Sequence, residues 1–226
     1  MKHSITTYAT LVFDCDGVVL DSNTVKSEAF YQAALPYGDT AAQALVDHHV
    51  ANGGVSRYMK FAHFLERIVP QHAANCAGPD LETLLENYAG EVRQGLMTCQ
   101  FAPGLRKLRE HTPHARWLIV SGGDQAELRE VFAKRGLAEL FDGGILGSPD
   151  TKDEILAREL AHGTIQQPAL FLGDSKYDYQ AASAAGLDFV FLSGWSEVID
   201  WSSWVKNARL NSVPSIAALL KEREKE

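Results

Sequence analysis

The chain has 226 residues, of which 46% are hydrophobic and 22% charged, and its 21 Lys and Arg against 29 Asp and Glu give a formal net charge of −8. These proportions are typical of a globular protein and exclude a disordered chain, in which fewer apolar residues accompany the charge. The acidic balance argues against nucleic acid as a partner, because phosphate backbones select a basic surface. A small anionic ligand stays possible, since one metal ion or lysine can reverse the field inside a cleft.

Nothing in the sequence indicates secretion or a membrane. The first ten residues are polar, and no apolar run approaches the ~20 residues of a membrane helix. Three cysteines, Cys15, Cys76 and Cys99, are an odd number without the close spacing of a zinc site. We therefore expect a cytoplasmic protein, and we expect the adjacent His48 and His49 to lie on a solvated helix face. No exposed apolar stripe stands out, so a monomer or weak homodimer is expected.

Short apolar runs predict strands that are buried on both faces, as in a parallel sheet. Helical patterns separate them, including a helix capped by Asp124, and this alternation predicts an α/β fold. In the tail, Trp201 and Trp204 are expected to cover the edge of the core. The predicted strands are residues 10–13, 116–120, 169–172, 189–192 and a short one at 208–210; further predicted helices are 152–160, 177–185 and 214–221.

The stretch after the first strand is different, because it reads as consecutive helices with no strand between them. Apolar residues recur with a 3.6-residue period over 58–69 and again over 81–92, where Asp80 is a candidate cap. Such a block predicts a helical cap domain, residues 23–100, inserted into an α/β core domain made of residues 1–22 and 101–226.

Polar residues gather where the predicted strands stop. In open parallel sheets, ligands bind beyond the carboxyl ends of the strands, so these side chains are expected to share one cleft. They are Asp14 and Asp16 after the first strand, Ser121 and Gly122 after the second, Asp174 and Asp178 after the third, and Lys152 at the start of a helix.

These residue types suit phosphoryl transfer. Four carboxylates in one cleft repel each other, and a divalent cation such as Mg²⁺, which prefers oxygen ligands, relieves the repulsion. One carboxylate is a competent nucleophile towards phosphorus, and a second one two residues later can act as acid and base. A serine hydroxyl, glycine N–H groups and a lysine can hold the phosphate oxygens. The pattern therefore predicts an enzyme acting on a small phosphorylated metabolite.

The motifs resemble those of the haloacid dehalogenase superfamily, in the branch with a helical cap of the β-phosphoglucomutase and phosphoglycolate phosphatase type. The first motif is matched by residues 13–22, the second by 120–122, the third by Lys152 and the fourth by 173–178. Residues 101–105 are similar to the segment that returns from the cap. The resemblance spans about residues 11–192, and it implies a Rossmann-like core with an inserted all-helical cap.

The resemblance also implies a role for each matched residue. Asp14 is expected to be the nucleophile and a Mg²⁺ ligand, forming an aspartyl-phosphate. Asp16 is expected to be the general acid and base, with its backbone carbonyl on the metal. Asp174 is expected to bind the metal directly. The remaining expectations are that Ser121, Gly122 and Lys152 hold the phosphoryl group, and that Asp178 contacts metal-bound water or Lys152.

Asp16 favours a phosphatase among the superfamily's reactions, because dehalogenases and phosphonatases lack this acid. Two alternatives stay open: a sugar phosphomutase of the β-phosphoglucomutase type, which shares all four motifs, and a non-catalytic binding module that keeps the fold. Substrate choice is expected to belong to the cap, with Arg57 and Asn23 as candidates for contacting a sugar, polyol or related metabolite phosphate.

Overall fold

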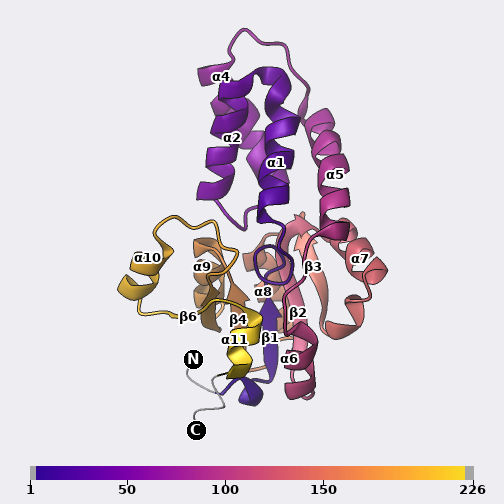
Figure 1. Cartoon of the computed structure of the whole chain (residues 1–226), viewed down its shortest axis with the longest axis vertical. Coiled ribbons are helices and arrows are strands. Elements are labelled where there is room, and N and C mark those ends of the chain that lie inside the picture. The colour runs from indigo at the N-terminus through magenta and orange to yellow at the C-terminus, as the bar shows by residue number, and fades with distance from the viewer. Residues whose placement is uncertain (1–3, 222–226) are drawn as a thin grey trace.

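The computed structural model describes residues 4–221 and contains one six-stranded parallel sheet, in the order β3-β2-β1-β4-β5-β6 (Figure 1). The central pair, β1 and β4, aligns Phe13 with Leu172, so these strands end side by side. The strands are β1 (Thr10–Phe13), β2 (Arg116–Asp124), β3 (Gly144–Ser148), β4 (Ala169–Gly173), β5 (Asp188–Leu192) and β6 (Asn211–Val213).

Helices cover both faces of the sheet because its strands are apolar on both sides. Leu11 and Phe13 belong to the apolar cluster of one face, and Val12 belongs to the cluster of the other. The first face is covered by α6 (Leu105–His111), α7 (Gln125–Lys134) and α11 (Ile216–Lys221); the second is covered by α8 (Lys152–Ala161), α9 (Lys176–Ala184) and α10 (Trp201–Asn207). Short 3₁₀ turns occupy Ile5–Thr7, Leu35–Tyr37 and Ala138–Leu140.

A group of helices between β1 and α6 lies beyond the carboxyl ends of the strands (Figure 1). We call it the helical insert. The two connections to the sheet run side by side, because Asp21 N donates to Gln100 O at 2.8 Å and Ala102 N donates to Val19 O at 2.8 Å. The insert comprises α1 (Asn23–Ala34), α2 (Asp39–Ala51), α3 (Arg57–His63), a π-helical turn (Phe64–Ile68), α4 (Val69–His72) and α5 (Leu81–Thr98).

The α/β class with a parallel sheet is confirmed. The division into a core domain and a cap domain stays a prediction, and its outer limits at residues 1 and 226 lie outside the described residues. Within residues 4–221, no helix is both long and apolar enough to cross a membrane.

Two local predictions were wrong, and one strand was not predicted. The strand β3 was missed, because Gly144 and Gly147 interrupt its apolar run. The second strand continues to Asp124, which pairs with Ser148 after a register irregularity. In the tail, residues 208–210 do not form the edge strand, because Arg209 has a φ of 55° in a turn and the strand follows at Asn211–Val213.

Candidate active site

Three carboxylates converge at the ends of the two central strands. Asp14 directly follows β1, Asp174 directly follows β4, and Asp178 lies in the first turn of α9. All three side chains are buried, and one carboxylate oxygen of each lies within 4.8 Å of the other two. The sequence-predicted cluster is therefore present for these three residues.

Lys152 is the cation in contact with this cluster. It opens α8, its side chain is fully buried, and its Nζ lies 2.9 Å from Asp14 Oδ1 and also bonds Asp178 Oδ1. Asp14 Oδ1 accepts a second hydrogen bond from Cys15 N at 2.7 Å. One lysine therefore holds two of the three carboxylates in place.

The lysine does not fully offset the cost of burying three acids. Burial and the charge of Asp178 raise the pKa of Asp14 to about 7, although Lys152 acts in the opposite direction. Burial and the charges of Asp14 and Asp178 also raise the pKa of Asp174 well above its ordinary value. Clustered carboxylate oxygens that resist ionisation suit a hard divalent cation such as Mg²⁺.

The metal-free protein is expected to become more stable as the pH falls from about 8 to about 5. The folded-state pKa of Asp14, about 7, lies above the ordinary 3.8, so the folded protein keeps a proton that the unfolded chain releases. Stability should therefore rise as the pH falls through 7, by on the order of 1–3 kcal/mol.

Thermal unfolding in EDTA at several pH values and constant ionic strength measures this effect. Saturating Mg²⁺ and, separately, Asp14→Asn should each flatten the profile. A metal-free stability that falls steadily from pH 8 to pH 5, with the same slope in Asp14→Asn, would contradict the assigned electrostatics.

Asp178 is fixed by its own helix as well as by Lys152. Ser175 caps α9, and Asp178 Oδ2 accepts from Ser175 N at 3.0 Å and from Ser175 Oγ at 2.7 Å. A weaker bond of 3.2 Å comes from Asp174 N. With both oxygens engaged, Asp178 is placed to position Lys152.

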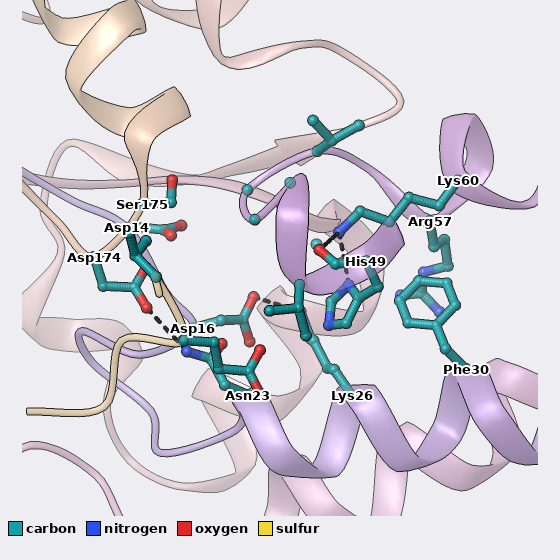
Figure 2. Close-up of a pocket in the computed structure, with 18 of the residues that line it drawn as sticks. Asp14, Asp16, Asn23, Lys26, Phe30, His49, Arg57, Lys60, Asp174 and Ser175 are labelled. Atoms are coloured by element: carbon teal, nitrogen blue, oxygen red, sulfur yellow. Dashed lines mark hydrogen bonds and ion pairs between the residues drawn. The ribbon is translucent and has the colours of Figure 1, made fainter. Parts of the chain in front are cut away.

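Asp16 does not join the cluster, because its side chain points towards the helical insert. It pairs with Lys26 of α1 (Figure 2), and it accepts from Ser22 Oγ at 2.6 Å. Burial alone would raise the pKa of Asp16, but Lys26 and Ser22 stabilise the carboxylate, and the net effect lowers it. Asp16 is therefore ionised in this arrangement, and Lys26 is a contact that the sequence reasoning missed.

Ser121 and Gly122 lie within β2 at the edge of the site. Ser121 is buried, and its Oγ accepts from Gly123 N at 3.0 Å. A loop of the insert packs here: Gly54 has a φ of +82°, and a Cβ on it would lie 3.1 Å from Ser175 Oγ and 3.4 Å from Lys152 Nζ. Glycine at this position therefore lets the insert approach Lys152.

The two predicted substrate contacts both border the cavity, but their polar groups already have protein partners. Asn23 Nδ2 donates to Asp174 Oδ2 at 2.9 Å and to Trp195 O at 2.8 Å. Arg57 pairs with Glu127 of α7 and lies 4.9 Å from the Tyr88 ring centroid. Asn23 thus orients a candidate metal ligand, and Arg57 ties the insert to α7.

A cavity lies between the acidic cluster and the insert (Figure 2). Its far side contains residues that the sequence reasoning did not single out as functional, Lys26, Phe30, His49 and Lys60. The expectation of a solvated His48–His49 pair was wrong for His49, which is only 7% exposed and packs 4.5 Å from the Phe30 ring. The four-residue spacing of Lys26 and Phe30 on α1 is the one signal that could have placed them on a shared face.

Solved structures share this fold. One, described as a predicted phosphoglycolate phosphatase from Haemophilus somnus, is 16% identical with a TM-score of 0.73, covering 95% of this chain and 97% of that one. A phosphonoacetaldehyde hydrolase-like protein from Oleispira antarctica is 15% identical with a TM-score of 0.71, covering 94% and 90%. A predicted phosphatase from Clostridium acetobutylicum is 16% identical with a TM-score of 0.67, covering 97% and 99%.

The comparison with curated protein sequences finds no match. A family model described as haloacid dehalogenase-like hydrolase matches residues 8–186, well over half of the chain. With the acidic cluster, the buried lysine and the sheet order already in place, this match settles the family: the chain belongs to the haloacid dehalogenase-like hydrolases.

Proposed function

We propose that this hydrolase is a Mg²⁺-dependent phosphatase of a small phosphomonoester, with Asp14 as the nucleophile. The observation that carries the proposal is the buried Asp14, held through Oδ1 by Lys152 and Cys15 at the end of the central strand. No hydrogen bond from the described residues engages its other oxygen, Oδ2, which is left to attack phosphorus. The phosphatase descriptions of two structural neighbours agree with this chemistry.

In the proposed first step, Asp14 Oδ2 forms a bond to phosphorus while the ester oxygen of the substrate leaves. Lys152 and the backbone N–H groups near Ser121 and Gly122 stabilise the charge on the phosphoryl oxygens. Asp16 donates a proton to the leaving oxygen, and it then takes one from the water that hydrolyses the aspartyl-phosphate.

For Asp16 to donate a proton, its pairing with Lys26 must change during the cycle. The carboxylate is ionised while Lys26 and Ser22 hold it, which suits the second step, in which it acts as a base. We propose that substrate entry and movement of the insert, acting as a cap, alter this contact.

The proposed ligands of the metal ion are Asp14, Asp174 and the backbone carbonyl of Asp16. Asp178 does not bind the ion in this proposal and instead holds Lys152. When bound, Mg²⁺ would offset the negative charge of the cluster and of the phosphoryl group. A cytoplasmic location and a monomeric or weakly dimeric state stay sequence-based predictions.

A sugar phosphomutase remains the second candidate, because a loop of the insert packs directly against the site, and transfer without hydrolysis requires the insert to keep water out. The loop at Gly54 approaches Lys152, and a Cβ on Gly122 would lie 2.2 Å from Gly54 O. Excluding bulk water would protect a phosphorylated Asp14 until a second hydroxyl group arrives.

The purified protein is expected to release phosphate from an aryl phosphate with Mg²⁺ and to lose this activity in EDTA. Excess Mg²⁺ should restore it, because the carboxylate cluster is intact. Phosphate release that is equal with and without the metal would contradict the proposal. Formation of glucose 6-phosphate from glucose 1-phosphate with a bisphosphate primer, faster than hydrolysis, would favour the mutase.

A further inference from the structure

The side of the cavity that faces the acidic cluster is built by three helices of the insert. Phe30 comes from α1, His49 from α2 and Lys60 from α3, and all three are buried (Figure 2). We call these three residues the insert chamber. Since the phosphoryl group must lie at Asp14, the chamber faces the organic part of the substrate.

Lys60 differs from the other cations that border this cavity. Lys26 pairs with Asp16, and Arg57 pairs with Glu127. Lys60 is only 2% exposed, yet within the described chain no carboxylate lies within 4.0 Å of its Nζ. Its hydrogen-bond partners both belong to His49, with Nδ1 at 2.7 Å and the backbone oxygen at 3.5 Å, and neither carries a negative charge.

His49 provides a buried donor that has no partner in the described protein. The pKa of His49 falls to about 2, through burial and then the neighbouring Lys60, so the imidazole is neutral. When Lys60 is charged, its ammonium can only donate; Nδ1 of His49 then accepts from it and the ring proton lies on Nε2. Among the described residues, His49 Nε2 is the one buried side-chain nitrogen or oxygen without a hydrogen-bond partner.

A buried N–H donor without an acceptor, and a buried ammonium without a counter-charge, are both costly unless a ligand supplies the missing partner. Burial and the nearby Lys26 lower the pKa of Lys60 to about 7, while Asp16 and Glu197 act in the opposite direction. An entering anion would stabilise the charged lysine and accept from both donors. A hydroxyl group is a poorer match, because it also brings a donor.

We infer that the insert chamber binds an acceptor-only anionic group, a carboxylate or a second phosphoryl group, on the organic part of the phosphomonoester. This inference rests on the proposed phosphatase function. Glu197 also borders the cavity, and it accepts a hydrogen bond from Ser27 Oγ at 3.2 Å. Its negative charge would repel an anionic ligand, so it limits the net negative charge of the ligand that the cavity can bind.

Binding measured by calorimetry with Mg²⁺ in an Asp14→Asn background tests this, because it needs no turnover. The probes are phosphoglycolate, ethylene glycol monophosphate, ethanolamine phosphate and propanediol bisphosphate. Phosphoglycolate should bind about 10- to 100-fold tighter than ethylene glycol monophosphate, the range of a charge-assisted hydrogen bond. Adding Lys60→Met should remove most of this preference, whereas the exposed Lys107→Met should keep it.

Lys60→Met is expected to fold, because an apolar chain of similar length replaces a buried ammonium. His49→Phe offers a second variant, which should weaken the preference by removing the Nε2 donor. A bisphosphate that binds tighter than phosphoglycolate would identify the second phosphoryl group as the anion. Equal affinity for the charged and neutral probes, no binding of any probe, or an unchanged preference in Lys60→Met would overturn the inference.

These outcomes are separate from the test of the phosphatase itself. If the wild-type protein hydrolyses an aryl phosphate with Mg²⁺ but shows no anion preference, only the assignment of the chamber fails. If phosphate release is absent, the proposed function fails, whatever the calorimetry shows.

Discussion

Asp14→Asn is expected to abolish phosphate release, lowering kcat by roughly a thousandfold or more. The amide has nearly the same shape but cannot attack phosphorus, and Oδ1 is already committed to Lys152 and Cys15. Initial rates of Mg²⁺-dependent hydrolysis of an aryl phosphate measure the effect. Asp153→Asn is the matched control, because Asp153 is exposed and follows Lys152 directly, and it should stay within about twofold of wild type.

The same variant separates chemistry from folding. Asp14 is an acid whose pKa is raised by burial and by Asp178, so removing its charge should leave the metal-free protein at least as stable at pH 8. A folded Asp14→Asn protein that retains a tenth of wild-type kcat would rule out Asp14 as the nucleophile.

Lys152→Met should lose activity and also destabilise the metal-free protein, by roughly 3–5 kcal/mol near pH 8. Lys152 bonds both Asp14 and Asp178, and Asp174 lies in the same cluster, so its removal leaves three buried carboxylates without a cation. Urea unfolding followed by circular dichroism measures the loss. Lys176→Met is the matched control, because Lys176 opens α9 as Lys152 opens α8 but is exposed.

The destabilisation of Lys152→Met should shrink as the pH falls towards 5, because protonation of the clustered acids removes the repulsion. Saturating Mg²⁺ should also recover part of the stability, although not the activity. A destabilisation that is the same at pH 8 and pH 5 would show that Lys152 acts through packing rather than through its charge.

The core of the site could be predicted from the sequence because chain order and strand ends determine it. Asp14 and Asp174 directly follow apolar runs that become neighbouring parallel strands, and this pairing brings the two side chains together. The helix caps at Asp124 and Asp80 could also be predicted, and each carboxylate accepts a hydrogen bond from the backbone N–H three residues later. Local rules suffice where the relevant partner lies on an adjacent strand or in the same turn.

The insert chamber could not be predicted, because it depends on which faces of three helices meet. His49 and Lys60 lie on different helices, and nothing in the spacing of either helix indicates that their side chains bond. Arg57 borders the cavity, and its expected contact with substrate stays a prediction; its pairing with Glu127 on α7 follows from how the insert packs against the helices of the sheet. The strand β3 could not be predicted for a similar reason. Its glycines weaken the local apolar pattern, and its pairing with β2 is a contact between segments distant in the sequence.

Trapping the phosphorylated enzyme tests the central claim most directly. Asp16→Ala should still accept a phosphoryl group from an aryl phosphate, whose leaving group needs no acid, but should hydrolyse it slowly because the base is missing. Rapid acid quench followed by peptide mass spectrometry is expected to find one phosphoryl group on Asp14, and none in Asp14→Asn. A phosphoryl group on another residue, or turnover without any phosphorylated Asp14, would contradict the account.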